Sequence, residues 1–141
     1  MSLKIITKMI GFSTQGQNDI INMTGLITEG LEKSGLRDGQ ATVFVIGSTA
    51  GVTTIEYEPG LVKDMAEAYG KLAPADKDYA HHETWGCDNG SSHVRAALQG
   101  PSLTIPFVKG RLTLGTWQQV VLTEFDTRPR DREIMLQLIG V

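Results

Sequence analysis

The sequence predicts an α+β domain in which two main helices pack on a mostly antiparallel sheet that closes toward a sandwich. Strand-like segments dominate the chain, short turns join the strands of its last third, and two long segments carry a helical repeat of apolar residues. With 141 residues, of which 40% are hydrophobic and 21% charged, the chain fits one domain spanning residues 1–141 with a substantial core.

The N-terminal third predicts two strands and a helix. Residues 4–12 are rich in isoleucine and alternate, and residues 19–23 form a second extended segment after a polar turn. Thr24 is the expected N-cap of the first helix, and Gly35 is the expected C-terminal glycine.

The middle third predicts two strands, a long helix and a long loop. Residues 42–46 and 52–57 are β-branched runs separated by a loop of small residues at 47–51. Pro59 begins a second helix whose apolar stripe runs from Leu61 to Leu72. We expect residues 73–90 to form a loop.

The last third predicts one short helix and then only strands. Ser91 or Ser92 is the expected cap of a helix that ends at Leu98, before Gly100 and Pro101. Four expected strands follow, at residues 103–108, 111–114, 117–125 and 132–139.

Charge and cysteine content limit the partners and the compartment. The net charge of −3 does not favour nucleic acid or an anionic membrane surface, and no apolar run is long enough to cross a bilayer. The single cysteine, Cys87, cannot form an intramolecular disulfide. We therefore expect a cytoplasmic protein that binds neither nucleic acid nor membrane.

The densest polar cluster runs from His81 to His93 and holds all three histidines and the cysteine. His82, Cys87 and His93 are ligand types for zinc or a similar metal, but their spacing matches no tight paired motif. The alternative is that the histidines are surface or capping residues and that Cys87 is a small buried apolar group. We favour a functional role for His82 and His93 and a structural one for Cys87.

Two further groups are weaker candidates. Glu56 lies on a strand, where it could act as ligand or base, although carboxylates there are usually solvated. Gln118 and Glu124 share a strand face by period two, and Arg132 on the next strand is an expected partner. A buried structural ion pair explains these residues as well as catalysis does.

Anion binding has candidates in two turns. Ser48 and Thr49, in the small-residue loop, could cradle an anion through backbone N–H groups. Lys109 and Arg111 flank a predicted turn, although basic residues at turns are mostly solvated. The sequence has no phosphate loop, nucleophile elbow or dinucleotide fingerprint.

The C-terminal half resembles the secondary thiamine-phosphate synthase family. The resemblance rests on the run from Gly100 to Pro106, on Gly110-Arg111-Leu112-Thr113-Leu114-Gly115-Thr116-Trp117-Gln118 and on Glu124-Phe125-Asp126. The stretch from Ser48 to Gly51, Glu56, His82, Asn89 and His93 also follow the order of the family, so the resemblance covers essentially the whole chain.

The resemblance implies an α+β homotrimer with a polar pocket that holds a divalent metal, zinc or magnesium, or an anion. The pocket residues that it implies are His82, Asn89, His93, Glu56, Gln118 and Glu124. Many relatives carry a histidine where this chain has Gly47. The implied metal ligands are therefore two histidines completed by a carboxylate, Cys87 or water.

From the resemblance we expect a transferase that joins hydroxymethylpyrimidine diphosphate to a thiazole phosphate and releases diphosphate. Lys109, Arg111 and Arg132 would bind the anion, His82 and His93 would hold a metal or act as general acid, and Glu56 would orient the aminopyrimidine. The alternatives are a trimer that binds a small phosphorylated metabolite and a metal-dependent hydrolase.

Overall fold

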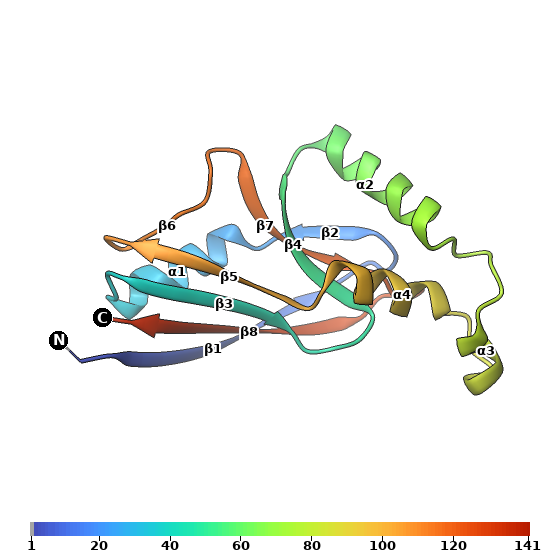
Figure 1. Ribbon diagram of the computed structural model, residues 1–141, viewed down its shortest axis with the longest axis horizontal. Coiled ribbons are helices and arrows are strands. Elements are labelled where there is room, and N and C mark those ends of the chain that lie inside the picture. Colours follow the sequence, from blue (N-terminus) through green and yellow to red (C-terminus); the bar gives the residue numbers. More distant parts are fainter. Residues whose placement is uncertain (1) are drawn as a thin grey trace.

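Two antiparallel sheets form a curled half-barrel in the computed structural model, which describes residues 2–141. The larger sheet has the strand order β1-β8-β3-β5-β6, and the smaller has the order β2-β7-β4. The strands are β1 (Lys4–Ser13), β2 (Asp19–Asn22), β3 (Gly39–Val45), β4 (Ala50–Glu56), β5 (Ser102–Val108), β6 (Arg111–Leu112), β7 (Gln118–Glu124) and β8 (Asp131–Gly140). Every strand pair is antiparallel, and the predicted α+β class is confirmed (Figure 1).

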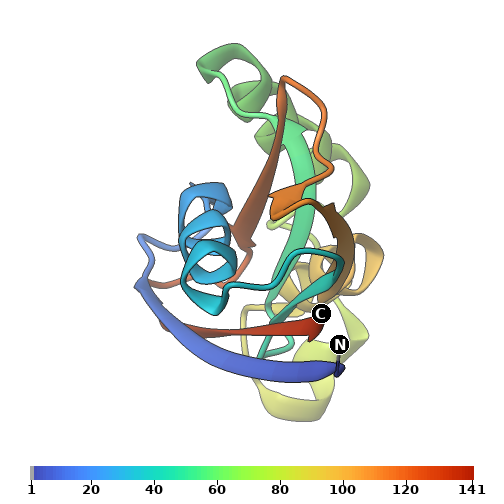
Figure 2. The same cartoon turned by 90° about the vertical axis from the view of Figure 1, so that its left-hand side faces the viewer.

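Four helices accompany the sheets within residues 2–141. They are α1 (Thr24–Ser34), α2 (Pro59–Leu72), α3 (Ala80–Trp85) and α4 (Gly90–Gln99). The end-on view shows α1 in the concave side of the curled sheets, whereas α2 and α4 lie beyond β4 (Figure 2). Within residues 2–141, no helix has the length and apolar character needed to cross a membrane.

The main core fills the space between α1 and the two sheets. Alternation along β8 buries Ile134, Leu136 and Leu138, while the residues between them are more exposed. Ile27 and Leu31 of α1 pack into the same cluster of buried residues. A smaller apolar cluster under α2 and α4 comprises Tyr69, Ala96 and Phe125.

The helix ends agree only partly with the predictions. Gly35 closes α1 in a left-handed conformation with φ of 72°, and Pro59 begins α2, as expected. The N-cap of α1 is Met23 rather than Thr24. The Thr24 hydroxyl instead accepts a hydrogen bond from the Val120 N–H at 2.8 Å, which ties the start of α1 to β7.

Three local predictions were wrong. The expected loop at 73–90 contains α3, which is too short to show an apolar repeat and ends at Gly86 in a left-handed conformation. The N-cap of α4 is Asn89, while Ser91 and Ser92 are buried within the helix. The strand expected at 111–114 stops at Leu112.

Candidate functional site

The base of the site is a buried ion pair between the end of β7 and the start of β8. Arg132 donates its Nε–H to Glu124 at 2.8 Å and its Nη2–H to the other carboxylate oxygen. Thr14 donates its hydroxyl to Glu124 at 2.7 Å, and Arg132 also donates to the Thr49 hydroxyl at 2.7 Å. Glu124 is 0% exposed. Glu124 and Arg132 therefore form a buried structural ion pair, which was the alternative to a catalytic role in the sequence analysis.

Asp126 follows Glu124 by two residues, and its hydrogen bond with Asn89 connects the ion pair to the start of α4. Its carboxylate accepts hydrogen bonds from the Thr127 N–H at 2.8 Å, from the Asn89 side chain at 3.4 Å and from Arg130. Burial alone would raise the pKa of Asp126, but these hydrogen bonds outweigh it and hold the pKa below its ordinary value of 3.8. Asp126 is therefore ionised at neutral pH.

His93 lies one helical turn after Asn89 and stacks against His81. The two ring centroids are 4.4 Å apart at an angle of 39°. Burial, and then His81, lower the pKa of His93 below its ordinary value of 6.5, although Asp126 and the Ser48 backbone act in the opposite direction. His93 is thus a mainly neutral imidazole, one helical turn after Asn89, whose side chain donates to the ionised Asp126 carboxylate.

Cys87 contacts His81, one member of this histidine pair. Its Sγ lies 2.9 Å from His81 Nδ1. Cys87 is half-buried and joins α3, through His81, to the segment that precedes α4. The expectation that Cys87 is only a small apolar group did not anticipate this polar contact.

His82 fulfils a capping role rather than facing His93. The Gly90 N–H, at the start of α4, donates to His82 Nε2 at 3.0 Å, so the lone pair of that nitrogen is already used. The His82 ring also packs edge-on against Tyr79 at 5.5 Å. The sequence had led us to expect His93 beside His82. The structure instead brings His93 together with His81.

A polar cavity of about 400 Å³ opens beside these residues. Its lining consists of Cys87, Asp88, Asn89, Asp126, Thr127 and Arg128. Asp88 accepts a hydrogen bond from the Thr127 hydroxyl at 3.3 Å, whereas Arg128 is exposed and forms no ion pair within residues 2–141. The cavity therefore offers one free guanidinium together with carboxylate and amide groups.

The loop at 47–49 forms another border of the site. Thr49 is buried and donates its hydroxyl to Asp126 at 3.3 Å, while Ser48 is exposed. A Cβ added at Gly47 would lie 2.8 Å from Arg132 Nη1. Position 47 therefore borders the buried ion pair. This chain has glycine there, where the sequence comparison with the resembled family had suggested a histidine.

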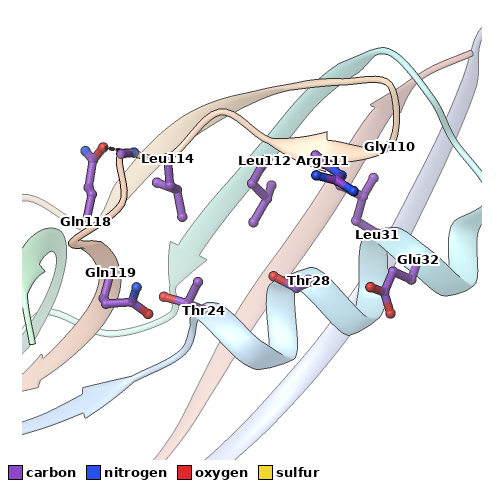
Figure 3. Close-up of a pocket in the computed structure, with 11 residues that line it drawn as sticks. Thr24, Thr28, Leu31, Glu32, Gly110, Arg111, Leu112, Leu114, Gln118 and Gln119 are labelled. Atoms are coloured by element: carbon purple, nitrogen blue, oxygen red, sulfur yellow. Dashed lines mark hydrogen bonds between the residues drawn. The ribbon is translucent and has the colours of Figure 1, made fainter.

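Four predicted site residues lie away from this cluster. Glu56 pairs with Gln118 at the far end of β4 and β7, six residues or about 20 Å from Glu124. Arg111 and Gln118 line a separate groove of about 420 Å³ beside α1. Arg111 lies at the end of this groove near Glu32, and Gln118 lies at the end near Thr24 (Figure 3). Lys109 lies in the turn between β5 and β6, where its N–H donates to Asp38.

The candidate metal ligands are not gathered into one group in the part of the chain that the structure describes. Among residues 2–141, no group of three or more histidine, cysteine, aspartate or glutamate side chains is arranged to hold a metal ion. His82 is occupied by the α4 amide, and Glu56 is remote. The metal-binding role of His82 and His93 stays a prediction, and the structure does not show these two rings in contact with each other.

Sequence reasoning missed Asp126 and His81 as site residues. Asp126 follows Glu124 by two positions, so the period that selected Glu124 could also have selected it. His81 was passed over in favour of its neighbour His82, because the short helix that decides which histidine faces α4 was expected to be a loop.

Comparison with known proteins gives a consistent family match. The family model described as UPF0047 protein YjbQ-like matches residues 8–141. A UPF0047 protein of Methanothermobacter thermautotrophicus is 33% identical over 138 residues, covering 98% of this chain and 94% of that protein. A UPF0047 protein of Synechocystis is 36% identical and covers 94% and 90%, respectively.

Solved structures show the same fold. A YbjQ-like protein of unknown function from Sulfolobus solfataricus has a TM-score of 0.92 at 28% identity, covering 99% of this chain and 100% of that one. A YjbQ/UPF0047 protein from Clostridium acetobutylicum has a TM-score of 0.80 at 36% identity, covering 92% and 98%.

These matches correct the family prediction. The residues that suggested the secondary thiamine-phosphate synthase family belong to a chain that matches the UPF0047 protein YjbQ-like family model and UPF0047 relatives. The expected transfer between two thiamine precursors, and with it a role in thiamine biosynthesis, has no support in these matches.

Proposed function

The chain belongs to the UPF0047 protein YjbQ-like family, and from the geometry of its site we propose that it binds a small phosphorylated metabolite bearing hydroxyl or amino groups, with His93 as the proton-transfer group. The observation that carries the proposal is a polar cavity lined by the ionised Asp126 and by Arg128, with His93 one helical turn after Asn89 of the same lining.

The cavity lining supports this class of ligand. Arg128 supplies a guanidinium that no carboxylate of residues 2–141 neutralises, and a guanidinium matches a phosphate in two-point geometry. Asp88 and Asn89 line the same cavity and can accept hydrogen bonds from hydroxyl or amino groups of the ligand. A purely anionic ligand would be repelled by Asp88 and Asp126, so the ligand needs donors as well as the phosphate.

The histidine pair supplies the chemistry. A neutral imidazole can take a proton from a hydroxyl or amino group, and the nearby Asp126 carboxylate stabilises the imidazolium that results. The stacked His81, which contacts Cys87, helps to keep the proton off the free His93. Glu124 and Arg132 do not line the cavity. Glu124 accepts a hydrogen bond from the Asp126 N–H, so the ion pair helps to position Asp126.

The test compares phosphorylated compounds with their unphosphorylated counterparts. We expect O-phosphoethanolamine or glucosamine 6-phosphate to bind in calorimetry more tightly than ethanolamine or glucosamine. Arg128→Gln should remove the difference, whereas Arg37→Gln, at an exposed arginine elsewhere, should keep it. Equal affinity for both members of each pair in the wild type would refute the phosphate part of the proposal.

The proton-transfer role is tested separately from binding. A panel of phosphorylated sugars and amines is screened by NMR for turnover, and His93→Gln should abolish turnover while changing the Kd by less than about threefold. A His93→Gln variant that retains the turnover of the wild type would rule out His93 as the proton-transfer group.

Self-association is a further part of the proposal, and we keep the expected homotrimer. The larger sheet exposes several large apolar side chains on β1, β3 and β5, which favours contact with another copy. These side chains are Ile5, Met9, Phe44 and Val108. A cytoplasmic location, supported by the single cysteine, completes the proposal.

A further inference from the structure

A second cavity lies between α2 and α4, on the side of β4 that faces away from α1. Its volume is about 330 Å³. The lining consists of Thr53, Met65, Tyr69, Leu72, Arg95, Leu98 and Gln99, none of which lines the cavity beside Asp126. Figure 1 shows the two helices on the same side of β4.

Arg95 is the unusual member of this lining. It is 4% exposed, and its two hydrogen bonds go to neutral acceptors. Its Nε–H donates to the Ala73 carbonyl at 3.0 Å, and its Nη1–H donates to Asn18 Oδ1 at 3.2 Å. No carboxylate of residues 2–141 lies within ion-pair distance of its guanidinium.

A buried guanidinium without a counter-charge is costly, because it has lost water and gained no anion. Burial accordingly lowers the pKa of Arg95, while Tyr79 and Tyr69 act in the opposite direction. An arginine nevertheless stays protonated in proteins. The guanidinium has five N–H donors. The bonds to Ala73 and Asn18 use one donor on Nε and one on Nη1, and they fix the plane of the group. The donors on Nη2 have no protein acceptor among residues 2–141.

The other walls of the cavity are mostly apolar. Leu72 is 68% exposed and Leu98 is 66% exposed, and Met65 is half-buried between them and the core. Tyr69 donates its hydroxyl to Gln99 Oε1, and Gln99 in turn donates to Thr123 at 3.3 Å. The polar groups beside Arg95 therefore bond to each other, and the cavity combines one unneutralised cation with an apolar surface.

We propose that this cavity binds a small amphipathic organic anion of the aliphatic carboxylate class. The carboxylate pairs with the free donors of Arg95, and the hydrocarbon part lies against Met65, Leu72 and Leu98. The volume is at the lower end of the range for small-molecule sites, which suits a short chain rather than a macromolecular partner. The proposal concerns a different cavity from the phosphorylated-metabolite site and does not depend on it.

The test uses octanoate as the probe and octan-1-ol as the matched uncharged compound. NMR of ¹⁵N-labelled protein follows the Arg95 Nε–H and the Gln99 side-chain amide. We expect octanoate at millimolar concentration to shift both signals saturably, and octan-1-ol to leave the Arg95 signal unchanged.

Two variants separate the cavity from a general charge effect without altering Arg95, whose removal could unfold the chain. Leu98→Glu places a carboxylate at the cavity, and it should weaken octanoate binding by about tenfold or more through like-charge repulsion. Ala97→Glu adds the same charge at an exposed position of α4 outside the lining, and it should change the Kd by less than about twofold.

Three results would overturn the proposal. They are the absence of a saturable shift at Arg95, an equal response of Arg95 to octan-1-ol, and an equal loss of affinity in Leu98→Glu and Ala97→Glu. Binding of phosphorylated compounds beside Asp126 is measured on other signals, so its failure leaves this result unaffected.

Discussion

Replacing Arg132 by methionine tests whether the buried ion pair supports the site. Methionine retains much of the aliphatic volume and removes the guanidinium. Three hydrogen bonds disappear, two to Glu124 and one to Thr49. Glu124 is then left fully buried, with hydrogen bonds from only Thr14 and the Asp126 N–H.

The expected loss is large because one charge of a buried pair remains. Removing one partner of such a pair typically costs about 3–5 kcal/mol in the free energy of unfolding. With a urea m-value of about 2 kcal/mol/M, a loss of about 4 kcal/mol lowers the unfolding midpoint by about 2 M. Circular dichroism during urea titration measures this midpoint directly.

Two further variants show that the uncompensated charge is the cause. The double variant Glu124→Leu with Arg132→Met should be more stable than Arg132→Met alone, since it leaves no charge behind. Glu29→Gln breaks an exposed pair with Lys33 and should cost less than about 1 kcal/mol. A loss below about 1 kcal/mol for Arg132→Met, or a double variant less stable than it, would refute this reasoning.

Three other outcomes follow from the structure. Burial and His81 lower the folded-state pKa of His93, so its contribution to stability is complete above the ordinary pKa of 6.5 and is lost as the pH falls from there through the lower folded-state pKa. The difference between urea curves at about pH 7 and pH 5 should therefore be smaller in His93→Gln. Gly39→Ala should cost more than about 2 kcal/mol in urea unfolding, since the new methyl would overlap the backbone of β8, whereas Gly11→Ala, with open space around it, should cost nothing. Phe44→Glu on the larger sheet should convert the expected trimer into monomers in light scattering, and a monomeric wild type would contradict the trimer.

Most of the architecture could be predicted because it depends on local periodicity. The alternation in residues 132–139 and the Pro59 and Gly35 signals each identify an element without knowledge of its partners, and the structure has β8, α2 and the end of α1 at these positions. Short elements were less predictable. Six residues of α3 carry no measurable repeat, and so the loop assigned there was wrong.

The site was harder to predict because it depends on which residues meet across the sheets. Gln118 and Glu124 share a strand, but the strand is long enough to separate them by about 20 Å. His82 and His93 looked like a pair in sequence, yet the Gly90 amide engages His82 and the ring that meets His93 is His81. These choices are made by the tertiary packing of α3 and α4, which a single sequence does not show.

The most direct test of the proposed function is the pKa of His93, measured by NMR titration of its ring signals with and without O-phosphoethanolamine. The free protein should show a pKa below 6.5. Bound phosphate should raise this pKa, because a nearby anion favours the imidazolium, and ethanolamine should leave it unchanged. A pKa at or above 6.5 in the free protein, or one that does not respond to the phosphorylated compound, would contradict the account.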